Sequence, residues 1–297
     1  MTVTRDIKAE VREFWEAHPC GAKFVSSEIG SPQFFRAVSQ HRYETEWHIP
    51  QVVKFETWRG RSVLEVGCGL GTDAVRFAQA GAHYTGIDLT RRAVDLTRSR
   101  FETEGLRGEF RVADAEQLPF EAERFDLFYS HGVLHHTPDM ASAIAEAHRV
   151  LKPGGTAMVM LYNRYSYNYY INIMAIRRLG ARMLRFDWGP RMIHRLTGES
   201  IERLEEFQEM YRRDRLQLLD RGTFLNNNTD GVGNPLARVY TRREARRIFH
   251  DFTSVRTEVH FLNKRWIPLV GRFLPRGFES ALASVAGWHL WIIARKV

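Results

Sequence analysis

Residues 62–71 read Ser-Val-Leu-Glu-Val-Gly-Cys-Gly-Leu-Gly, a short apolar run that passes directly into three glycines. Residues 72–78 then show a helical pattern, so the stretch predicts a strand, a glycine turn and a helix. Glycines at such a turn let a ligand approach the backbone, and the N-terminus of the helix attracts anionic groups. The stretch therefore predicts an α/β fold with a site for a nucleotide-like ligand.

Strand and helix patterns continue to alternate after this unit, which predicts a doubly wound parallel sheet. We expect further strands at 83–88, 109–113, 125–130 and 156–162, and helices at 90–104 and 139–151. Two later runs, 254–262 and 288–295, have the composition of strands, and a helix is expected at 241–250 between the earlier strands and these.

The other segments predict four parts of the chain. Residues 1–58 form an N-terminal helical cap with helices over 5–16 and from Ser31-Pro32, and 59–163 form a cofactor-binding Rossmann-like core. Residues 164–235 are a helical lid insertion, with a helix from Glu199 to Asp220 closed by Gly222 and a turn-rich loop at 226–235. Residues 236–297 complete the sheet and contain a second insertion at 263–286.

Composition narrows the function classes. Of the 297 residues, 44% are hydrophobic and 26% charged, which is typical of a globular chain and not of a disordered one. No apolar run is long enough to span a membrane and the first 30 residues are charged, so we expect a cytoplasmic protein. Only Cys20 and Cys68 are present, which disfavours a disulfide framework, and no set of ligand residues predicts a metal.

The net charge of +8 comes mostly from arginine, and the chain has no compact basic run, so nucleic acid is a minority interpretation. Asp88 stands 21 residues after Gly67, at the end of the second expected strand, where a carboxylate can accept hydrogen bonds from a ribose diol. The glycine order is G-x-G-x-G, whereas nicotinamide-dependent oxidoreductases use G-x-G-x-x-G. An oxidoreductase is therefore disfavoured.

Four segments occur in the order found in one known family. They are Glu65-Val66-Gly67-Cys68-Gly69-Leu70-Gly71, residues 112–120 (Val-Ala-Asp-Ala-Glu-Gln-Leu-Pro-Phe), residues 125–136 and residues 149–155 (Arg-Val-Leu-Lys-Pro-Gly-Gly). Together they resemble the class I S-adenosylmethionine-dependent methyltransferases, in particular the ubiquinone and menaquinone biosynthesis type. The resemblance implies a seven-stranded Rossmann-like sheet whose last strand is antiparallel.

The resemblance also implies the cofactor S-adenosyl-L-methionine, with S-adenosyl-L-homocysteine as product. It assigns ten residues to cofactor binding: Glu65, Gly67, Cys68, Gly69, Asp88, Leu89, Asp114, Ala115, Ser130 and His131. In this assignment the glycine loop holds the methionine part, Glu65 fixes the loop and Asp88 holds the ribose. Asp114 and Ala115 meet the adenine amino group, and Ser130 and His131 flank the sulfonium. A plain helix N-cap is the alternative role for Asp114.

Methyl transfer is an in-line displacement that depends chiefly on positioning, with a base needed for a hydroxyl or an acidic carbon. His135 and His136 follow the fourth strand, at the edge where ligands of α/β sheets bind, and are candidate bases. Capping or packing roles for these histidines remain open. Tyr162, at the end of the fifth strand, is the candidate that faces the acceptor.

The function predicted from these residues is methyl transfer to a small, lipophilic or aromatic acceptor. A noncatalytic cofactor-binding or partner-binding module is the alternative, because a fold does not fix a function. A nucleic-acid methyltransferase is favoured less, since Ser130-His131-Gly132-Val133 replaces an Asn-Pro-Pro-Tyr type sequence. Peripheral membrane contact through 263–286 is a further hypothesis, and oligomeric state is open.

Overall fold

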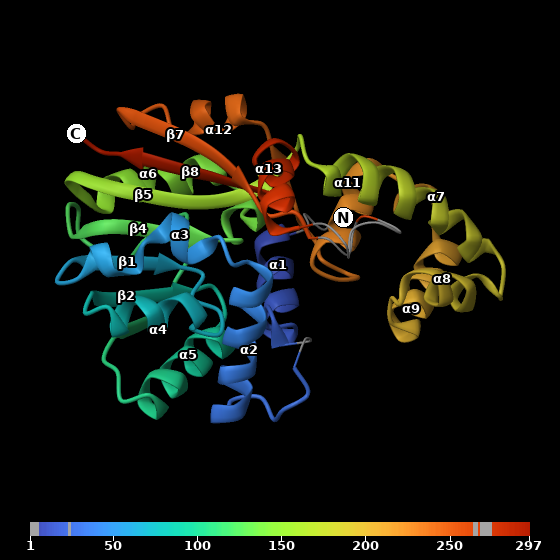
Figure 1. Cartoon of the computed structure of the whole chain (residues 1–297), viewed down its shortest axis with the longest axis horizontal. Helices are drawn as coiled ribbons and strands as arrows, with labels where there is room; N and C mark the ends of the chain where they lie inside the picture. The colour runs from blue at the N-terminus through green and yellow to red at the C-terminus, as the bar shows by residue number, and fades with distance from the viewer. Residues whose placement is uncertain (1–5, 23–24, 264–266, 268–274) are drawn as a thin grey trace.

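The computed structural model describes residues 6–22, 25–263, 267 and 275–297. Within these ranges one sheet runs through the molecule in the order β3-β2-β1-β4-β5-β8-β7, and β6 pairs with β5 beside this path (Figure 1). The strands are β1 Ser62–Val66, β2 His83–Asp88, β3 Glu109–Val112, β4 Phe125–His131, β5 Leu151–Asn163, β6 Val239–Tyr240, β7 Ser254–His260 and β8 His289–Arg295.

The sheet confirms the predicted fold class. Strands β1 to β5 are parallel, whereas β8 lies antiparallel between β5 and β7. Strand β6 was not predicted, because its two residues, paired with Tyr162 and Asn163, are too few to show a strand pattern. The sequential order reverses between β1 and β4, and parallel sheets bind ligands at such a switch point, beyond the carboxyl ends of the strands.

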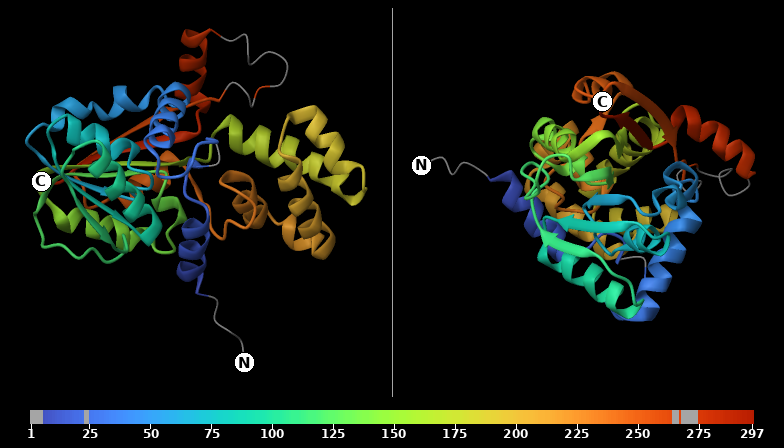
Figure 2. Two further views of the ribbon diagram at one scale, coloured as in Figure 1. Left: turned by 90° about the horizontal axis from the view of Figure 1, so that it is seen from below. Right: turned by 90° about the vertical axis from the view of Figure 1, so that its left-hand side faces the viewer.

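Helices cover both faces of the sheet (Figure 2). One face packs against α3, η2, α4 and α5, and the other packs against α6 and α12. The helices are α1 Ile7–Ala17, α2 Pro32–Thr45, α3 Ile49–Val53, η2 Phe55–Trp58, α4 Thr72–Gln79, α5 Arg91–Thr103, η3 Leu134–His136, α6 Met140–Val150, η4 Asn168–Arg177, α7 Arg178–Gly180, η5 Ala181–Arg185, α8 Gly189–Thr197, α9 Ile201–Arg213, α10 Arg215–Leu218, α11 Arg221–Thr229, α12 Arg242–Ile248 and α13 Arg276–Ala286.

The predicted helix from Glu199 to Asp220 is two helices. Asp214 ends α9 and is also the N-cap of α10, where its side chain accepts a hydrogen bond from the backbone N–H of Gln217. An aspartate that bonds the backbone ahead of it starts a new helix more readily than it continues an old one. The helix expected to run unbroken is therefore interrupted at this residue.

The loop predicted at 226–235 begins later than expected, because α11 extends through Thr229. Asp220 caps this helix, so Gly222 lies in its first turn and does not close the preceding helix. The Asn227 and Asn228 side chains donate back to carbonyls four residues earlier, which satisfies their amides inside a helix. Turn-forming composition alone could not show these bonds.

In the second insertion, α13 occupies the last eleven residues. Four large apolar residues of this insertion lie outside the described residues: Trp266, Val270, Phe273 and Leu274. No helix in the described ranges combines the length and the apolar character that a bilayer-crossing segment needs.

Candidate active site

The glycine loop joins β1 to α4 at the switch point of the sheet. Gly67, Gly69 and Gly71 all have positive φ values, of 83°, 54° and 69°. A Cβ at Gly67 would lie 2.1 Å from Val133, so the loop packs directly on the turn that follows β4. A Cβ at Gly69 would meet no atom within 4 Å, so the backbone there borders open space. This is the part of the loop that a ligand can approach.

Side chains of helix α5 donate hydrogen bonds to the backbone of the glycine loop. The Thr97 hydroxyl donates to the carbonyl of Gly69 at 3.0 Å, and the buried guanidinium of Arg100 donates to the carbonyl of Leu70 at 3.2 Å. Arg100 also bonds Ser39 of α2, which ties the N-terminal cap to the loop. Sequence reasoning missed Arg100, because a lone arginine in a helix carries no motif.

Glu65 supports the loop from the interior of the sheet. Its carboxylate accepts a 2.6 Å hydrogen bond from Tyr84 and is only 4% exposed. Burial, and then the charge of Asp73, raise the pKa of Glu65 well above its usual range. The carboxylate thus bonds β2 and not the loop itself, and the role of Glu65 in fixing the loop stays a prediction.

Asp88 ends β2 beside the loop. One carboxylate oxygen accepts from the backbone N–H and the hydroxyl of Thr90, and the other accepts from Gly69 N–H at 3.2 Å. A carboxylate offers about four acceptor positions, so these bonds leave roughly one for a ribose hydroxyl. Burial raises the pKa of Asp88, although the bonds from Thr90 oppose this shift. Leu89 next to it is half-buried.

Asp114 lies in the turn after β3 and is not a helix cap. One of its oxygens accepts from the N–H of Glu116, and the other forms a 2.6 Å ion pair with Lys8 of α1. Lys8 also bonds Glu116, and Ala115 is half-buried between these two acidic residues. Helix α1 therefore reaches the edge expected to hold adenine, a contact that the sequence did not predict.

Ser130 and His131 end β4 on opposite sides of the sheet. The Ser130 hydroxyl is fully buried and donates to the carbonyl of Val66, which joins β4 to β1 just before the glycine loop. The His131 ring instead faces α2, where the Nη2 atom of Arg42 lies 2.9 Å from its Nδ1. Burial, and then Arg42, lower the pKa of His131 well below its usual range.

Asp73 is the shared hydrogen-bond acceptor for the polar side chains that lie between α2 and the sheet. It lies in the first turn of α4 and accepts hydrogen bonds from Arg42, Tyr43 and Tyr129. The pKa of Tyr129 is raised by burial and by the charge of Asp73. Because Tyr43 and Arg42 come from α2, this cluster fastens the N-terminal cap onto the glycine-loop helix.

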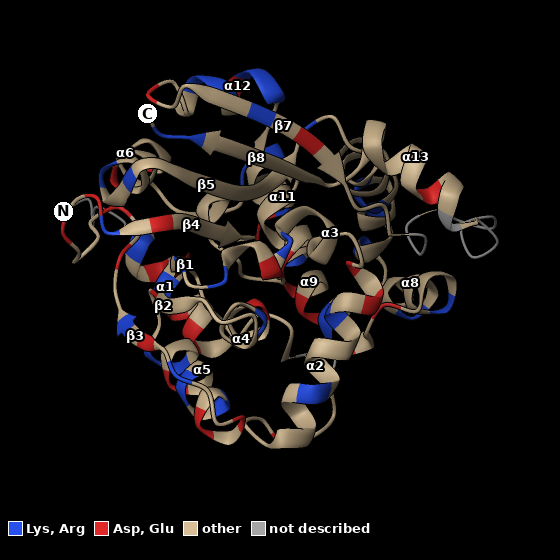
Figure 3. Cartoon of the chain, turned by 60° about the vertical axis from the view of Figure 1, so that its left-hand side comes forward, with Lys and Arg blue, Asp and Glu red and all other residues tan. Residues whose placement is uncertain are grey.

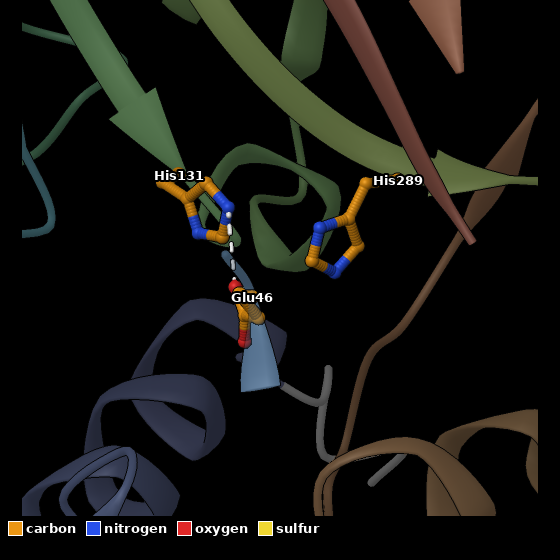
Figure 4. Close-up of side chains that lie close together, drawn as sticks. All are labelled: Glu46, His131 and His289. Atoms are coloured by element: carbon orange, nitrogen blue, oxygen red, sulfur yellow. Dashed lines mark ion pairs between the residues drawn. The ribbon is translucent and has the colours of Figure 1, made fainter. Parts of the chain in front are cut away.

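Glu46, His131 and His289 bring three possible metal-ligand atoms within 4.8 Å of one another (Figure 4). The Nε2 atom of His131 lies 3.6 Å from the Glu46 carboxylate. Arginine can only donate, so Arg42 requires a lone pair on Nδ1 of His131 and places the ring proton on Nε2. A metal-bound histidine needs the opposite arrangement, with its second nitrogen donating. The Arg42 contact therefore places a proton on the His131 nitrogen nearest Glu46, where a metal ion would need a lone pair.

The three candidate catalytic residues lie close together beyond the carboxyl end of β4. His135 and His136 lie in η3, and their rings are 4.4 Å apart. The Tyr162 ring is 3.7 Å from His135 and stacks at 4.3 Å on Trp288. The structure thus brings together side chains from η3, β5 and the start of β8.

Asp230 links two of these residues and was missed in the sequence, where it belonged to a predicted loop. Its carboxylate accepts from the Tyr162 hydroxyl at 2.8 Å and lies 3.3 Å from Nε2 of His136. The other ring nitrogen of His136 bonds the carbonyl of Leu236. Burial opposes ionisation of Asp230, but His136 lowers its pKa below the usual range.

His135 differs from its neighbour because, among the residues that the structure describes, neither of its ring nitrogens has a hydrogen-bond partner. The residue is fully buried, and buried polar atoms in folded proteins are normally bonded to protein, water or a ligand. Burial, and then His136, lower the pKa of His135 well below its usual range, so the ring is neutral near pH 7. A neutral imidazole has one nitrogen lone pair that can accept a proton, but the burial that lowers the pKa also disfavours the protonated ring.

Comparison with known proteins identifies the domain that carries this site. A family model described as a methyltransferase domain matches residues 64–159, which include the glycine loop, Asp88 and Asp114. The chain carries a class I S-adenosylmethionine-dependent methyltransferase domain. The resemblance seen in the sequence is confirmed, and S-adenosylmethionine is the cofactor of this class.

Relatives of the methyltransferase domain include two ubiquinone biosynthesis O-methyltransferases. The protein from Aromatoleum aromaticum is 34% identical over 126 residues, which are 42% of this chain and 52% of the relative. The protein from Actinobacillus pleuropneumoniae is 36% identical over 120 residues, or 39% and 51% of the two chains. The match thus spans about half the length of these curated relatives.

Among solved structures, magnesium protoporphyrin IX methyltransferase from Synechocystis PCC 6803 with bound SAH has a TM-score of 0.55 to this chain. The two chains are 13% identical, and the alignment covers 98% of this chain and 100% of the other. At this identity the likeness shows the fold of the methyltransferase domain and its surroundings.

Proposed function

We propose that the chain transfers a methyl group from S-adenosylmethionine to a small lipophilic or aromatic acceptor. The observation that carries this proposal is His135, whose two ring nitrogens are buried without a partner beyond the end of β4. The open backbone of Gly69 and the carboxylate of Asp88 lie at the same edge of the sheet. A cofactor site and an unpartnered base thus border one switch point.

The residues present fit the cofactor at each end. The backbone beside Gly69 has room for a ligand, and Asp88 keeps about one acceptor position for a ribose hydroxyl. Asp114, already paired with Lys8, would accept from the adenine amino group. When bound, S-adenosylmethionine supplies an electrophilic methyl group. The chain supplies the positions of the two reactants, which is the main requirement of an in-line displacement.

On the acceptor side, His135 would take the proton of the attacking group. Its ring is neutral near pH 7, so it can accept a proton without first losing one. Asp230 holds His136 and Tyr162 in place, and Trp288 stacks on the other side of Tyr162. These aromatic rings would pack against a planar acceptor, which favours a phenolic substrate.

The cofactor assignment is tested by calorimetric titration with S-adenosylhomocysteine, with NADH as the negative control. Replacing Asp88 by alanine should weaken binding by about 1–3 kcal/mol, because a hydrogen bond to a charged group is lost. The matched control is Asp95→Ala, which removes an exposed carboxylate of α5 paired only with Arg98. Equal affinity in the Asp88 variant and the wild type would contradict the ribose assignment.

The catalytic assignment is tested by turnover on a panel of phenols and quinols, measured as S-adenosylhomocysteine formed. His135→Ala should slow transfer by roughly 100-fold while leaving the affinity for S-adenosylhomocysteine unchanged, because a positioned base contributes about that much. His250→Ala, which removes an exposed histidine of the C-terminal region, is the control. Full turnover in the His135 variant would show that this residue is not the base.

Cofactor binding without transfer to any member of the panel would contradict the phenolic acceptor. The assignment of the cofactor residues would stand in that case, because the titration measures it independently.

A further inference from the structure

The outer part of the helical insertion carries a surface that the proposed reaction does not use. Helices α7, α8 and α9 lie well away from the sheet, at the right-hand end of Figure 1. We call the exposed residues between 176 and 196 the insertion tip. Its apolar members are Ile176, Leu179, Phe186, Trp188, Met192 and Leu196, and its basic members are Arg182, Arg185, Arg191 and Arg195.

The exposure of these apolar side chains follows a helical pattern. Leu179, Trp188 and Leu196 are 62%, 50% and 73% exposed, whereas Ala181 and Leu184 on the inner side of the same segment are buried. The insertion therefore already has a packed inner face. Trp188, Met192 and Leu196 recur at four-residue spacing along α8, as in an amphipathic helix whose apolar side contacts something outside the chain.

The arginines of the insertion tip have no counter-charge within the described residues. No ion pair joins Arg182, Arg191 or Arg195 to a carboxylate there, and Arg185 lies over the Phe186 ring at 4.3 Å. Phe186 in turn stacks on Trp188, with ring centroids 5.0 Å apart. Arg177 and Arg203 of the same insertion, in contrast, both pair with Glu199. The tip is thus both apolar and cationic, and Figure 3 marks the basic residues of α8.

We propose that the insertion tip docks on an anionic lipid bilayer surface. Tryptophan, phenylalanine and leucine beside arginine suit the boundary between headgroups and acyl chains, where the rings enter and the charges meet lipid phosphates. A second copy of the same face would bring four arginines against four arginines, with Asp187 as the tip's one acidic residue and already paired to Arg212. Charge complementarity therefore selects an anionic occupant.

The test is flotation of the purified protein with vesicles of phosphatidylcholine alone or with added phosphatidylglycerol. The wild type should bind the anionic vesicles and bind the neutral ones at least about tenfold more weakly, since each basic residue near such a surface adds measurable attraction. Arg191→Glu with Arg195→Glu should reduce binding to anionic vesicles at least about tenfold. Trp188→Ala with Leu196→Ala should reduce it as well, through lost apolar burial.

Two matched variants distinguish binding through the insertion tip from nonspecific attraction of the whole protein surface to the vesicles. Arg242→Glu with Arg243→Glu makes the same charge change on exposed residues of α12. Phe278→Ala with Val285→Ala removes exposed apolar side chains from α13, and so tests the competing hypothesis that the membrane contact lies within 263–286. Both should retain wild-type vesicle binding. Retained affinity for S-adenosylhomocysteine would show that every variant is folded.

Three results would overturn the proposal. They are failure of the wild type to bind anionic vesicles, equal binding to neutral vesicles, and an equal loss in either matched variant. The first would leave an acidic protein as the remaining partner for this surface. None depends on methyl transfer, so the proposal can fail while the proposed function stands.

Discussion

The two halves of the candidate active site, one proposed for the cofactor and one for the acceptor, are built in different ways. On the cofactor side, each proposed residue lies at the end of a strand: the glycine loop after β1, Asp88 at the end of β2 and Asp114 after β3. Their hydrogen bonds join adjacent strand ends, as between Gly69 and Asp88. On the acceptor side, Asp230 joins Tyr162 to His136 from the end of a separate helical insertion. The cofactor side thus depends on local backbone geometry, whereas the acceptor side depends on contacts between segments that are distant in the sequence. The second half can change with its insertions while the first stays fixed.

The largest expected effect lies in the local half. Gly67→Ala should reduce stability by roughly 3–4 kcal/mol, because a left-handed backbone position disfavours alanine and the new methyl would meet Val133 at 2.1 Å. Gly60→Ala is the matched control, since Gly60 has φ 68° and no atom within 4 Å of an added Cβ. Urea unfolding of both variants measures the difference. Equal losses would mean that the close packing on Val133 contributes nothing.

A smaller effect is expected in the assembled half, from Asp230→Asn. Removing the charge beside His136 should reduce stability at pH 7 by about 3 kcal/mol, the cost of breaking a buried pair. The folded pKa of Asp230 is lowered, so its contribution is present above the unfolded pKa of about 4 and is lost as the pH falls through the folded pKa.

Urea unfolding from pH 7 to pH 3 checks this prediction. The difference in the free energy of unfolding between the Asp230→Asn variant and the wild type should be constant down to about pH 5. It should become smaller below about pH 4. Asp187→Asn, at a carboxylate that is 96% exposed, should cost less than about 1 kcal/mol and is the control. A difference that grows toward low pH would contradict the assigned charge state of Asp230.

The smallest effect is expected where the two halves are joined. Helix α1 pairs Lys8 with Asp114 on the cofactor side and places Trp15 against the His136 ring on the acceptor side. Lys8→Ala should reduce stability by less than about 1 kcal/mol, since the lysine is partly exposed and its ion pairs are screened. Urea unfolding of the variant and the wild type in low and in high salt measures this effect. The difference between their free energies of unfolding should become smaller as the salt concentration increases. A difference independent of salt would mean that Lys8 acts through packing.

The sequence predicted the strands and the glycine turn that carry the proposed cofactor residues, and it did so for a physical reason. Each element there leaves a local signature, such as glycines at positive φ in the loop at 67–71 or an aspartate at the end of β2. The histidines of η3 were also found, because they follow β4 directly.

The missed residues depend on contacts between distant segments. Asp230 follows a helix that was expected to be a loop, and Arg100 acts through carbonyls 30 positions away, so neither has a pattern of its own. The direction of His131 also depended on tertiary contact. It faces α2 because successive residues of β4 point to opposite faces, and Arg42 lies on that side.

The place of β8 in the sheet has a consequence for how the chain folds. This strand lies between β5 and β7, and its partners in β5 are more than a hundred positions earlier in the sequence. Pairings between such distant residues form slowly, because a long loop must close before they gain stability. Until β8 arrives, β5 is an unpaired apolar edge of the kind that aggregates. During synthesis, the nascent chain would keep that edge until residues 289–295 leave the ribosome.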